Sequence, residues 1–321
     1  MSVEEKKFIP QIVVPYNKKG DIDFNSLTRL TKHYIEYGAM ALFANCDYNE
    51  IPELSSEERI AIVDHIVKTV GGAIPVIAGN FGNTIHEQAK FAKLNYALGV
   101  DAVIIFTSQI VDENDAENVF EENIKKLLIL TGDIPLGIYD CATPNKVKLS
   151  PFLMCQLAQS DRIIYYIDAN SDLSRIKEES RPRSDLNNCT MYYASVNYAV
   201  EALNSGFGGL SCLQGNYFPE LIVWLCRSFD NKSLKKQVDL VQQFLIDELA
   251  AMHRYYPQAC RYYLQKKGLI ATTYSRKLGT DFISEEVRTL MTGLEHRYEI
   301  LVDYVVEGWL DILKYNYIPL C

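Results

Sequence analysis

Residues 74–80 read Ile74-Pro75-Val76-Ile77-Ala78-Gly79-Asn80, a short and almost uninterrupted apolar run. Its hydrophobicity does not alternate, which is typical of a parallel strand covered on both faces. Amphipathic stretches with helical spacing flank it, Glu57–Val70 before it and Ile85–Leu98 after it. Ser55 and Glu58 form a capping-box pattern at the start of the first stretch. This part of the chain is therefore predicted to form a helix, a buried strand and a second helix.

The same alternation of strand and helix occupies most of the chain. The predicted strands are Ile9–Tyr16, Ala39–Cys46, Ile74–Asn80, Ala102–Thr107, Ile134–Cys141, Ile163–Ala169, Met191–Val196 and Gly209–Gly215. The predicted helices are Phe24–Tyr37, Glu57–Val70, Ile85–Leu98, Ala116–Leu130, Pro151–Gln159, Leu173–Glu179, Tyr198–Ser205 and Glu220–Phe229. Strand-then-helix units repeated in unbroken order indicate an α/β protein, specifically a closed (β/α)₈ TIM barrel.

From about Lys232 the pattern changes to helices alone. These are predicted at Ser233–Tyr255, Pro257–Lys267 and Ser284–Leu313. We therefore expect residues 1–230 to form the barrel and residues 231–321 to form a C-terminal helical subdomain packed on it.

Composition excludes several classes of protein. The 321 residues are 48% hydrophobic and 23% charged, with a net charge of -9 and no basic stripe, so nucleic-acid binding is not expected. No apolar run reaches the roughly 18 residues of a membrane span, and the N-terminus lacks an apolar signal region. The eight cysteines are dispersed without CxxC pairs, which is typical of reduced thiols. A cytoplasmic protein without a membrane partner is expected.

In barrels of this kind the active site lies where the strands end, because the following loops converge there. The predicted strand ends carry amides, phenols and carboxylates, but neither histidine nor lysine. All five histidines fall in predicted helices, so a zinc centre or a histidine base is not expected. No metal and no cofactor are predicted.

Several segments resemble the dihydrodipicolinate synthase and N-acetylneuraminate lyase family. Residues 74–80 with Gly82-Asn83-Thr84 resemble its third strand and glycine-rich turn, and Leu98–Val103 resembles its LGADAV motif. Ile138-Tyr139-Asp140 aligns with its YN-x-P segment. The resemblance also covers residues 12–15, 206–211 and 268–269, and so spans most of the chain.

The resemblance implies a Schiff-base aldolase, a carbon-carbon or carbon-oxygen lyase. Family enzymes form an imine between a 2-oxo acid and a lysine at the end of strand six, and a tyrosine at the end of strand five transfers protons. The tyrosine corresponds to Tyr139, but the lysine position is occupied by Ile167. An alkyl side chain cannot act as the nucleophile. Lys146 and Lys148 lie in the loop after strand five, where no desolvated pocket is expected to activate them.

Other family positions also differ. The GTTGE segment that holds the substrate carboxylate aligns with Cys46-Asp47-Tyr48-Asn49-Glu50, which retains only Glu50. Asp47 would repel a substrate carboxylate. The family's tyrosine after strand four aligns near Gln109-Ile110, and its arginine after strand five aligns with Pro144. Binding of pyruvate in the family pose is therefore not expected.

The resulting hypothesis is a pseudoenzyme, a non-catalytic or ligand-binding homologue that takes a small polar metabolite. One alternative is an enzyme with carboxylate and tyrosine acid-base or Mg²⁺-assisted chemistry, and another is a lyase acting on a 2-oxo acid or sugar acid, as the resemblance implies. The resemblance also implies a homodimer or homotetramer. Tyr139 is the candidate catalytic residue, and the candidate substrate-binding residues are Asp47, Tyr48, Glu50, Asn80, Asp140, Asp168, Asn197 and Gln214.

Overall fold

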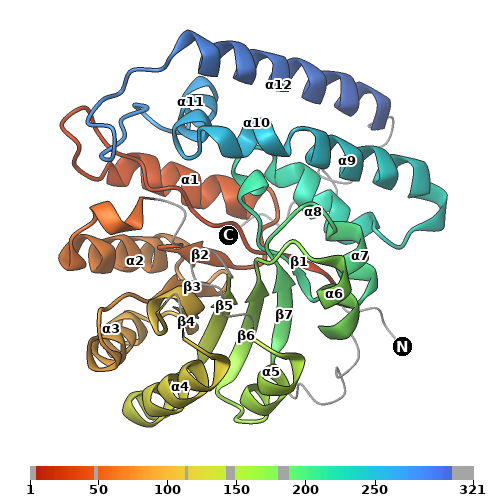
Figure 1. Cartoon of the computed structure of the whole chain (residues 1–321). Helices are drawn as coiled ribbons and strands as arrows, with labels where there is room; N and C mark the ends of the chain where they lie inside the picture. Colours follow the sequence, from red (N-terminus) through yellow and green to blue (C-terminus); the bar gives the residue numbers. More distant parts are fainter. Residues whose placement is uncertain (1–4, 47–49, 113–114, 142–148, 180–187, 306–321) are drawn as a thin grey trace.

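The structure is a computed structural model that describes residues 5–46, 50–112, 115–141, 149–179 and 188–305. Strands and helices alternate along the chain, and helices surround the strands (Figure 1). The strands are β1 (Lys7–Phe8), β2 (Leu42–Ala44), β3 (Val76–Gly79), β4 (Ala102–Phe106), β5 (Leu136–Asp140), β6 (Ile163–Asp168), β7 (Thr190–Tyr193) and β8 (Gly209–Leu210). The helices between and after them are α1 (Phe24–Glu36), α2 (Ser56–Val70), α3 (Ile85–Ala97), α4 (Glu117–Thr131), α5 (Pro151–Ala158), α6 (Leu173–Glu179), α7 (Ala199–Asn204) and α8 (Pro219–Ser228).

All strand pairs in the sheet are parallel, in the order β1-β8-β7-β6-β5-β4-β3-β2. The sheet closes through the segment that follows β1. Gln11 forms a parallel bridge to Phe43 of β2, where Ile12 N donates to Phe43 O over 3.0 Å and Phe43 N donates to Pro10 O over 3.0 Å. A continuous ladder of this kind defines a barrel. The predicted (β/α)₈ fold is confirmed.

The first and last strands differ from the prediction, because β1 lies just before the predicted run Ile9–Tyr16 and β8 is shorter than Gly209–Gly215. The run Ile9–Tyr16 is buried as expected, but Pro10 and Pro15 lack backbone donors and interrupt the ladder after β1. At the end of the barrel, β8 gives way to a 3₁₀ helix, Leu213–Asn216. A Cβ on Gly209 would lie 1.8 Å from Lys7 O, so only glycine allows β1 and β8 to pair here. The sequence pattern therefore placed the first strand after its observed position and predicted the last strand too long.

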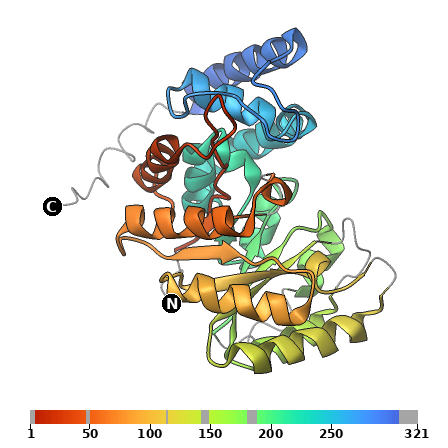
Figure 2. The same cartoon turned by 90° about the vertical axis from the view of Figure 1, so that its left-hand side faces the viewer.

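Helices after the barrel are α9 (Lys235–Asp247), α10 (Leu249–Arg254), α11 (Gln258–Lys266) and α12 (Glu285–Val305). The predicted helix Ser233–Tyr255 is divided into α9 and α10 at Glu248. These helices lie together on one side of the barrel, with α12 outermost (Figure 2). Arg261 of α11 donates to Val14 O after β1 over 3.0 Å, which ties the helical region to the strand ends. Within the described ranges, no helix combines the length and apolar character needed to cross a bilayer.

Candidate functional site

Tyr139 and Ile167 are register partners on β5 and β6, and both point into the barrel. The Tyr139 ring lies 5.3 Å from Phe106 of β4 and 6.1 Å from Phe43 of β2, measured between ring centroids. Strand β2 is three strands away from β5 in the sheet, so this second contact crosses the barrel interior. Tyr139 and Ile167 are 2% and 0% exposed. Ile167, at the position where the resemblance implies an imine-forming lysine, is thus a buried alkyl side chain next to a layer of aromatic rings.

One polar side chain contacts this inner layer from the opposite wall. Gln11 Nε2 donates to Ser211 O over 2.6 Å and to Tyr139 Oη over 3.5 Å, the latter at the limit of a hydrogen bond. Gln11 is 1% exposed, and its Oε1 has no hydrogen-bond partner among the described residues. The sequence analysis did not identify Gln11, because it lies in the middle of the first apolar run instead of at its end.

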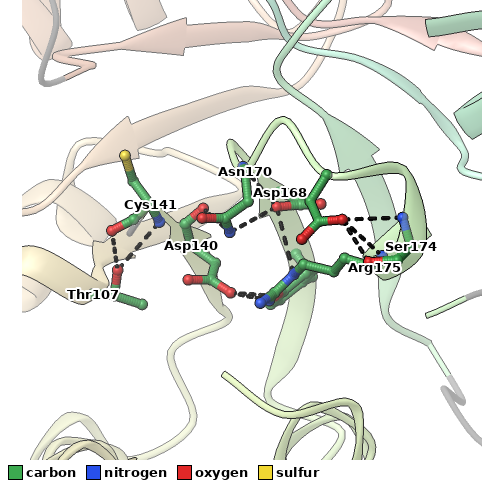
Figure 3. Close-up of polar contacts among 9 residues, drawn as sticks. Thr107, Asp140, Cys141, Asp168, Asn170, Ser174 and Arg175 are labelled. Atoms are coloured by element: carbon green, nitrogen blue, oxygen red, sulfur yellow. Dashed lines mark hydrogen bonds and ion pairs between the residues drawn. The ribbon is translucent and has the colours of Figure 1, made fainter. Parts of the chain in front are cut away.

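Asp140 and Asp168 lie on the other side of the same two strands. They too are register partners, one residue beyond Tyr139 and Ile167, and successive side chains of a strand point to opposite faces. Both therefore face the surrounding helices. Arg175 of α6 forms an ion pair with Asp140, and its Nε lies 3.8 Å from Asp168 Oδ1 (Figure 3). The structure brings together these two predicted residues, but outside the barrel interior.

Further hydrogen bonds complete this buried cluster. Tyr166 Oη donates to Asp140 Oδ2 over 2.5 Å, and Arg175 Nη2 donates to Tyr166 Oη over 2.6 Å. The backbone N and side-chain Nδ2 of Asn170 donate to Asp168 Oδ1 over 2.8 and 2.9 Å. Nearby, Thr107 Oγ1 accepts from Cys141 N and joins the ends of β4 and β5 (Figure 3). The cluster fixes the ends of β4, β5 and β6 to the start of α6.

The electrostatics of the cluster follow from its burial. Two carboxyl groups share one guanidinium, and Asp140 and Asp168 are both 0% exposed. Burial raises the pKa of Asp168 to about 6, against the opposing effect of Arg175. Burial also raises the pKa of Asp140, and Arg175 and Tyr166 oppose that rise. Arg175 occupies the place beside the carboxylates that a cation would need, so this pair does not favour a Mg²⁺ site.

Glu50 is directed toward the C-terminal helices. Its Oε2 lies 3.1 Å from Arg261 Nη1, and Ser275 Oγ donates to its Oε1 over 2.5 Å. Glu50 adopts a left-handed backbone conformation with φ 57°, and Arg261 is fully buried beside it. The Arg261 guanidinium also stacks on the Tyr16 ring at 4.9 Å. In this structure Glu50 joins the segment after β2 to α11.

The other predicted binding residues are distributed over three strand ends. Asn80 Nδ2 donates to Gln88 Oε1 of α3 over 2.6 Å, and Asn197 Nδ2 donates to Ser171 Oγ over 2.6 Å. Gln214 is buried after β8, and its Nε2 lies 2.8 Å from Nε2 of His253 on α10. The two remaining candidates, Asp47 and Tyr48, lie outside the described residues, as do Pro144, Lys146 and Lys148.

Arg175 and His253 are two further residues that sequence reasoning missed. Arg175 is the third residue of α6, directly after strand six. Its position in the sequence, a cation shortly after a strand that ends in a carboxylate, could have suggested the contact. His253 falls in a predicted helix and not at a strand end, and nothing in the sequence relates it to Gln214. Within the described ranges, no three or more His, Cys, Asp or Glu side chains are grouped to hold a metal.

The closed parallel sheet, with helices between its strands and further helices after the eighth, defines a (β/α)₈ barrel with a C-terminal helical region. A model of the Dihydrodipicolinate synthetase family matches residues 4–297, and the chain belongs to this family. It is 27% identical over 311 residues to 4-hydroxy-tetrahydrodipicolinate synthase of Ruegeria pomeroyi, covering 93% of this chain and 96% of that protein.

Solved structures agree with the fold. The 4-hydroxy-tetrahydrodipicolinate synthase of Methylacidiphilum fumariolicum SolV superposes with a TM-score of 0.83 at 18% identity, covering 95% of this chain and 99% of that chain. Dihydrodipicolinate synthase of Thermotoga maritima superposes with a TM-score of 0.82 at 21% identity, covering 92% and 98%.

Proposed function

We propose that this protein is a family barrel that does not form a Schiff base and that binds a small polar metabolite without turning it over. The observation that carries the proposal is the pairing of Ile167 with Tyr139 in the barrel interior. The register places the side chain at 167 beside the tyrosine that the resemblance assigns to proton transfer. A hydrocarbon there offers no lone pair to attack a carbonyl carbon.

The positions of the lysines support the proposal. A nucleophilic lysine usually needs a desolvated environment, because desolvation lowers the pKa of the amine. Among the described residues no lysine is buried: Lys6 and Lys7 are partly exposed and the others are exposed. Lys146 and Lys148 lie outside those residues, so the experiment must also cover them.

The carboxylate-based alternative has weaker support. Asp140 and Asp168 have raised pKa values, as many acid-base groups do. However, they face α6 and contact Arg175, whereas Tyr139 points into the barrel. A general acid or base must lie within hydrogen-bond reach of the reacting atoms. The carboxyl groups of Asp140 and Asp168 lie on the opposite side of the strands from Tyr139. They therefore cannot act on the same reacting atoms as Tyr139.

Reductive trapping tests the proposal. The purified protein is incubated with pyruvate and sodium borohydride, and its intact mass is measured. The Ruegeria pomeroyi synthase serves as the positive control, since the family resemblance implies imine formation in such enzymes. We expect no stable mass increase on this protein. A reduced pyruvate adduct mapped to any lysine, including Lys146 or Lys148, would overturn the proposal.

Binding and assembly belong to the same proposal. A thermal-shift panel of uncharged, anionic and cationic small metabolites should identify a stabilising ligand, because a ligand that binds only the folded state raises the unfolding temperature. A homodimer or homotetramer in the cytoplasm is the expected form. Light scattering at micromolar concentration tests the assembly, and the mass of a monomer would contradict it.

A further inference from the structure

A groove between α9 and α12 exposes apolar side chains far from the strand ends. It has a volume of about 370 Å³ and is lined by Leu240, Gln243, Phe244, Asp247, Glu248, Arg297, Ile300, Leu301 and Tyr304. Leu240, Ile300 and Tyr304 are 46%, 50% and 81% exposed. An exposed groove of this composition indicates a binding surface for another apolar segment.

The two ends of the groove differ. Figure 1 shows α9 and α12 side by side and running in opposite directions. At one end, Arg297 and Glu248 form an ion pair, with Arg297 Nη2 donating to Glu248 Oε2 over 2.7 Å. At the other end lie Leu240 and Tyr304, next to Val305, the last described residue of α12. The chain therefore continues from the open, apolar end of the groove.

The residues that follow are suited to this groove. Segment 306–321 begins with Val306-Glu307-Gly308 and then contains Trp309, Leu310, Ile312, Leu313, Tyr315, Tyr317, Ile318 and Leu320. Gly308 permits a reversal of chain direction, because glycine adopts left-handed conformations without steric cost. The single basic residue of the segment is Lys314, and its charge is opposite to that of Asp247, an exposed carboxylate on the groove wall.

We propose that segment 306–321 folds back onto the α9–α12 groove of its own chain and covers Leu240, Phe244 and Ile300. Residues 297 and 304 are about two helical turns apart, roughly 10 Å. The residues from Trp309 to Tyr317 span that distance even as a helix. Direct attachment to Val305 gives the segment an effective concentration in the millimolar range, which favours it over a free partner.

Trp309 provides the test, because Trp224 is the only other tryptophan in the sequence. The variant Trp224→Phe makes Trp309 the sole tryptophan reporter. We expect Trp309 to emit at short wavelength and to be several-fold less accessible to acrylamide than in the same protein carrying Leu240→Glu and Ile300→Glu. The matched control is Leu278→Glu, since Leu278 is 55% exposed but lies outside the groove. It should leave Trp309 protected.

The dependence on protein concentration identifies the occupant. Protection that is constant from 0.1 to 10 μM supports docking within one chain, whereas protection that appears only as the concentration rises would show a second copy and overturn the proposal. Emission typical of a solvated indole at every concentration would also overturn it. If Trp224→Phe does not fold, a chain ending at Val305 should bind a hydrophobic dye several-fold more strongly than the full chain, and equal binding would contradict the proposal.

Discussion

Ile167 lies beside Tyr139 across the β5–β6 ladder, and both side chains are buried in the barrel interior. Tyr139 lies near the end of strand five, while its neighbour on strand six has no group that can form a covalent bond to a ligand. The aromatic rings of Phe43 and Phe106 enclose the same layer. On this pair rests the proposal that the protein belongs to the family but does not form the imine that the resemblance implies.

Substitution Ile167→Lys should introduce an amine beside Tyr139. Because the position is fully buried, the pKa of this amine should fall, which favours the neutral, nucleophilic form. We expect a borohydride-reducible adduct with pyruvate at millimolar concentration, mapped by peptide mass spectrometry to position 167. Ile167→Met is the control of similar length without an amine. A folded Ile167→Lys protein that gives no adduct would indicate that pyruvate does not reach this layer.

Arg175 should be essential for stability because it neutralises a buried charge. Arg175→Met leaves Asp140 and Asp168 buried without a cation, and breaking a buried pair in this way costs about 3–5 kcal/mol. Urea unfolding measures the loss. Lys68→Met removes the exposed Lys68–Asp64 pair and should change stability by less than about 0.5 kcal/mol. Equal effects of the two substitutions would show that the buried cluster does not depend on Arg175.

The pKa of Asp168 predicts a pH dependence of stability. In the folded chain burial raises this pKa from 3.8 to about 6, so between these values the folded state holds a proton that the unfolded state releases. The contribution of Asp168 therefore increases as pH falls from 7 toward 4, by on the order of 2 kcal/mol, and is absent above about pH 6. Asp168→Asn can still accept both hydrogen bonds from Asn170 but cannot ionise.

We expect Asp168→Asn to be at least as stable as the native protein at pH 7, and the difference between the two proteins to shrink as pH falls to 4. Denaturant unfolding at several pH values measures it. Asp64→Asn, at an exposed site on α2, is the control for general charge effects. Identical pH profiles of the native protein and Asp168→Asn would contradict the assigned pKa.

The sequence predicted the barrel well because its signals are local. Buried parallel strands such as Val76–Gly79 appear as continuous apolar runs, and the Ser55–Glu58 capping box identified the start of α2 within one residue. The strand-end rule correctly selected Asp140 and Asp168 as neighbours. The rule could not reveal which side of the strands these two residues face, because that depends on register. It also could not reveal that Arg175 from the next helix would contact them.

Glu50 illustrates the same limit. The resemblance retains it as a substrate-segment residue, whereas its contacts with Arg261 and Ser275 depend on α11 and on the segment that follows it, more than 200 residues away in the sequence. A local pattern contains no information about such a partner. The aromatic filling around Tyr139 is likewise a property of several strands, and no single run indicates it.

The Glu50–Arg261 pair should join the barrel to the C-terminal helices, and its loss should destabilise both. Arg261→Met leaves the Glu50 carboxylate buried without a cation and removes the hydrogen bonds to Val14 O, so we expect a loss of about 3–5 kcal/mol in urea unfolding. The double variant Glu50→Gln with Arg261→Met should recover part of this loss, because no unpaired charge remains. Arg254→Met, at the exposed Arg254–Glu286 pair, is the control and should lose less than about 1 kcal/mol. If Arg261→Met resembles that control, neither the charge nor the hydrogen bonds of Arg261 contribute to the association of the two regions, and other contacts between them, such as the Arg276–Glu58 ion pair, must hold them together.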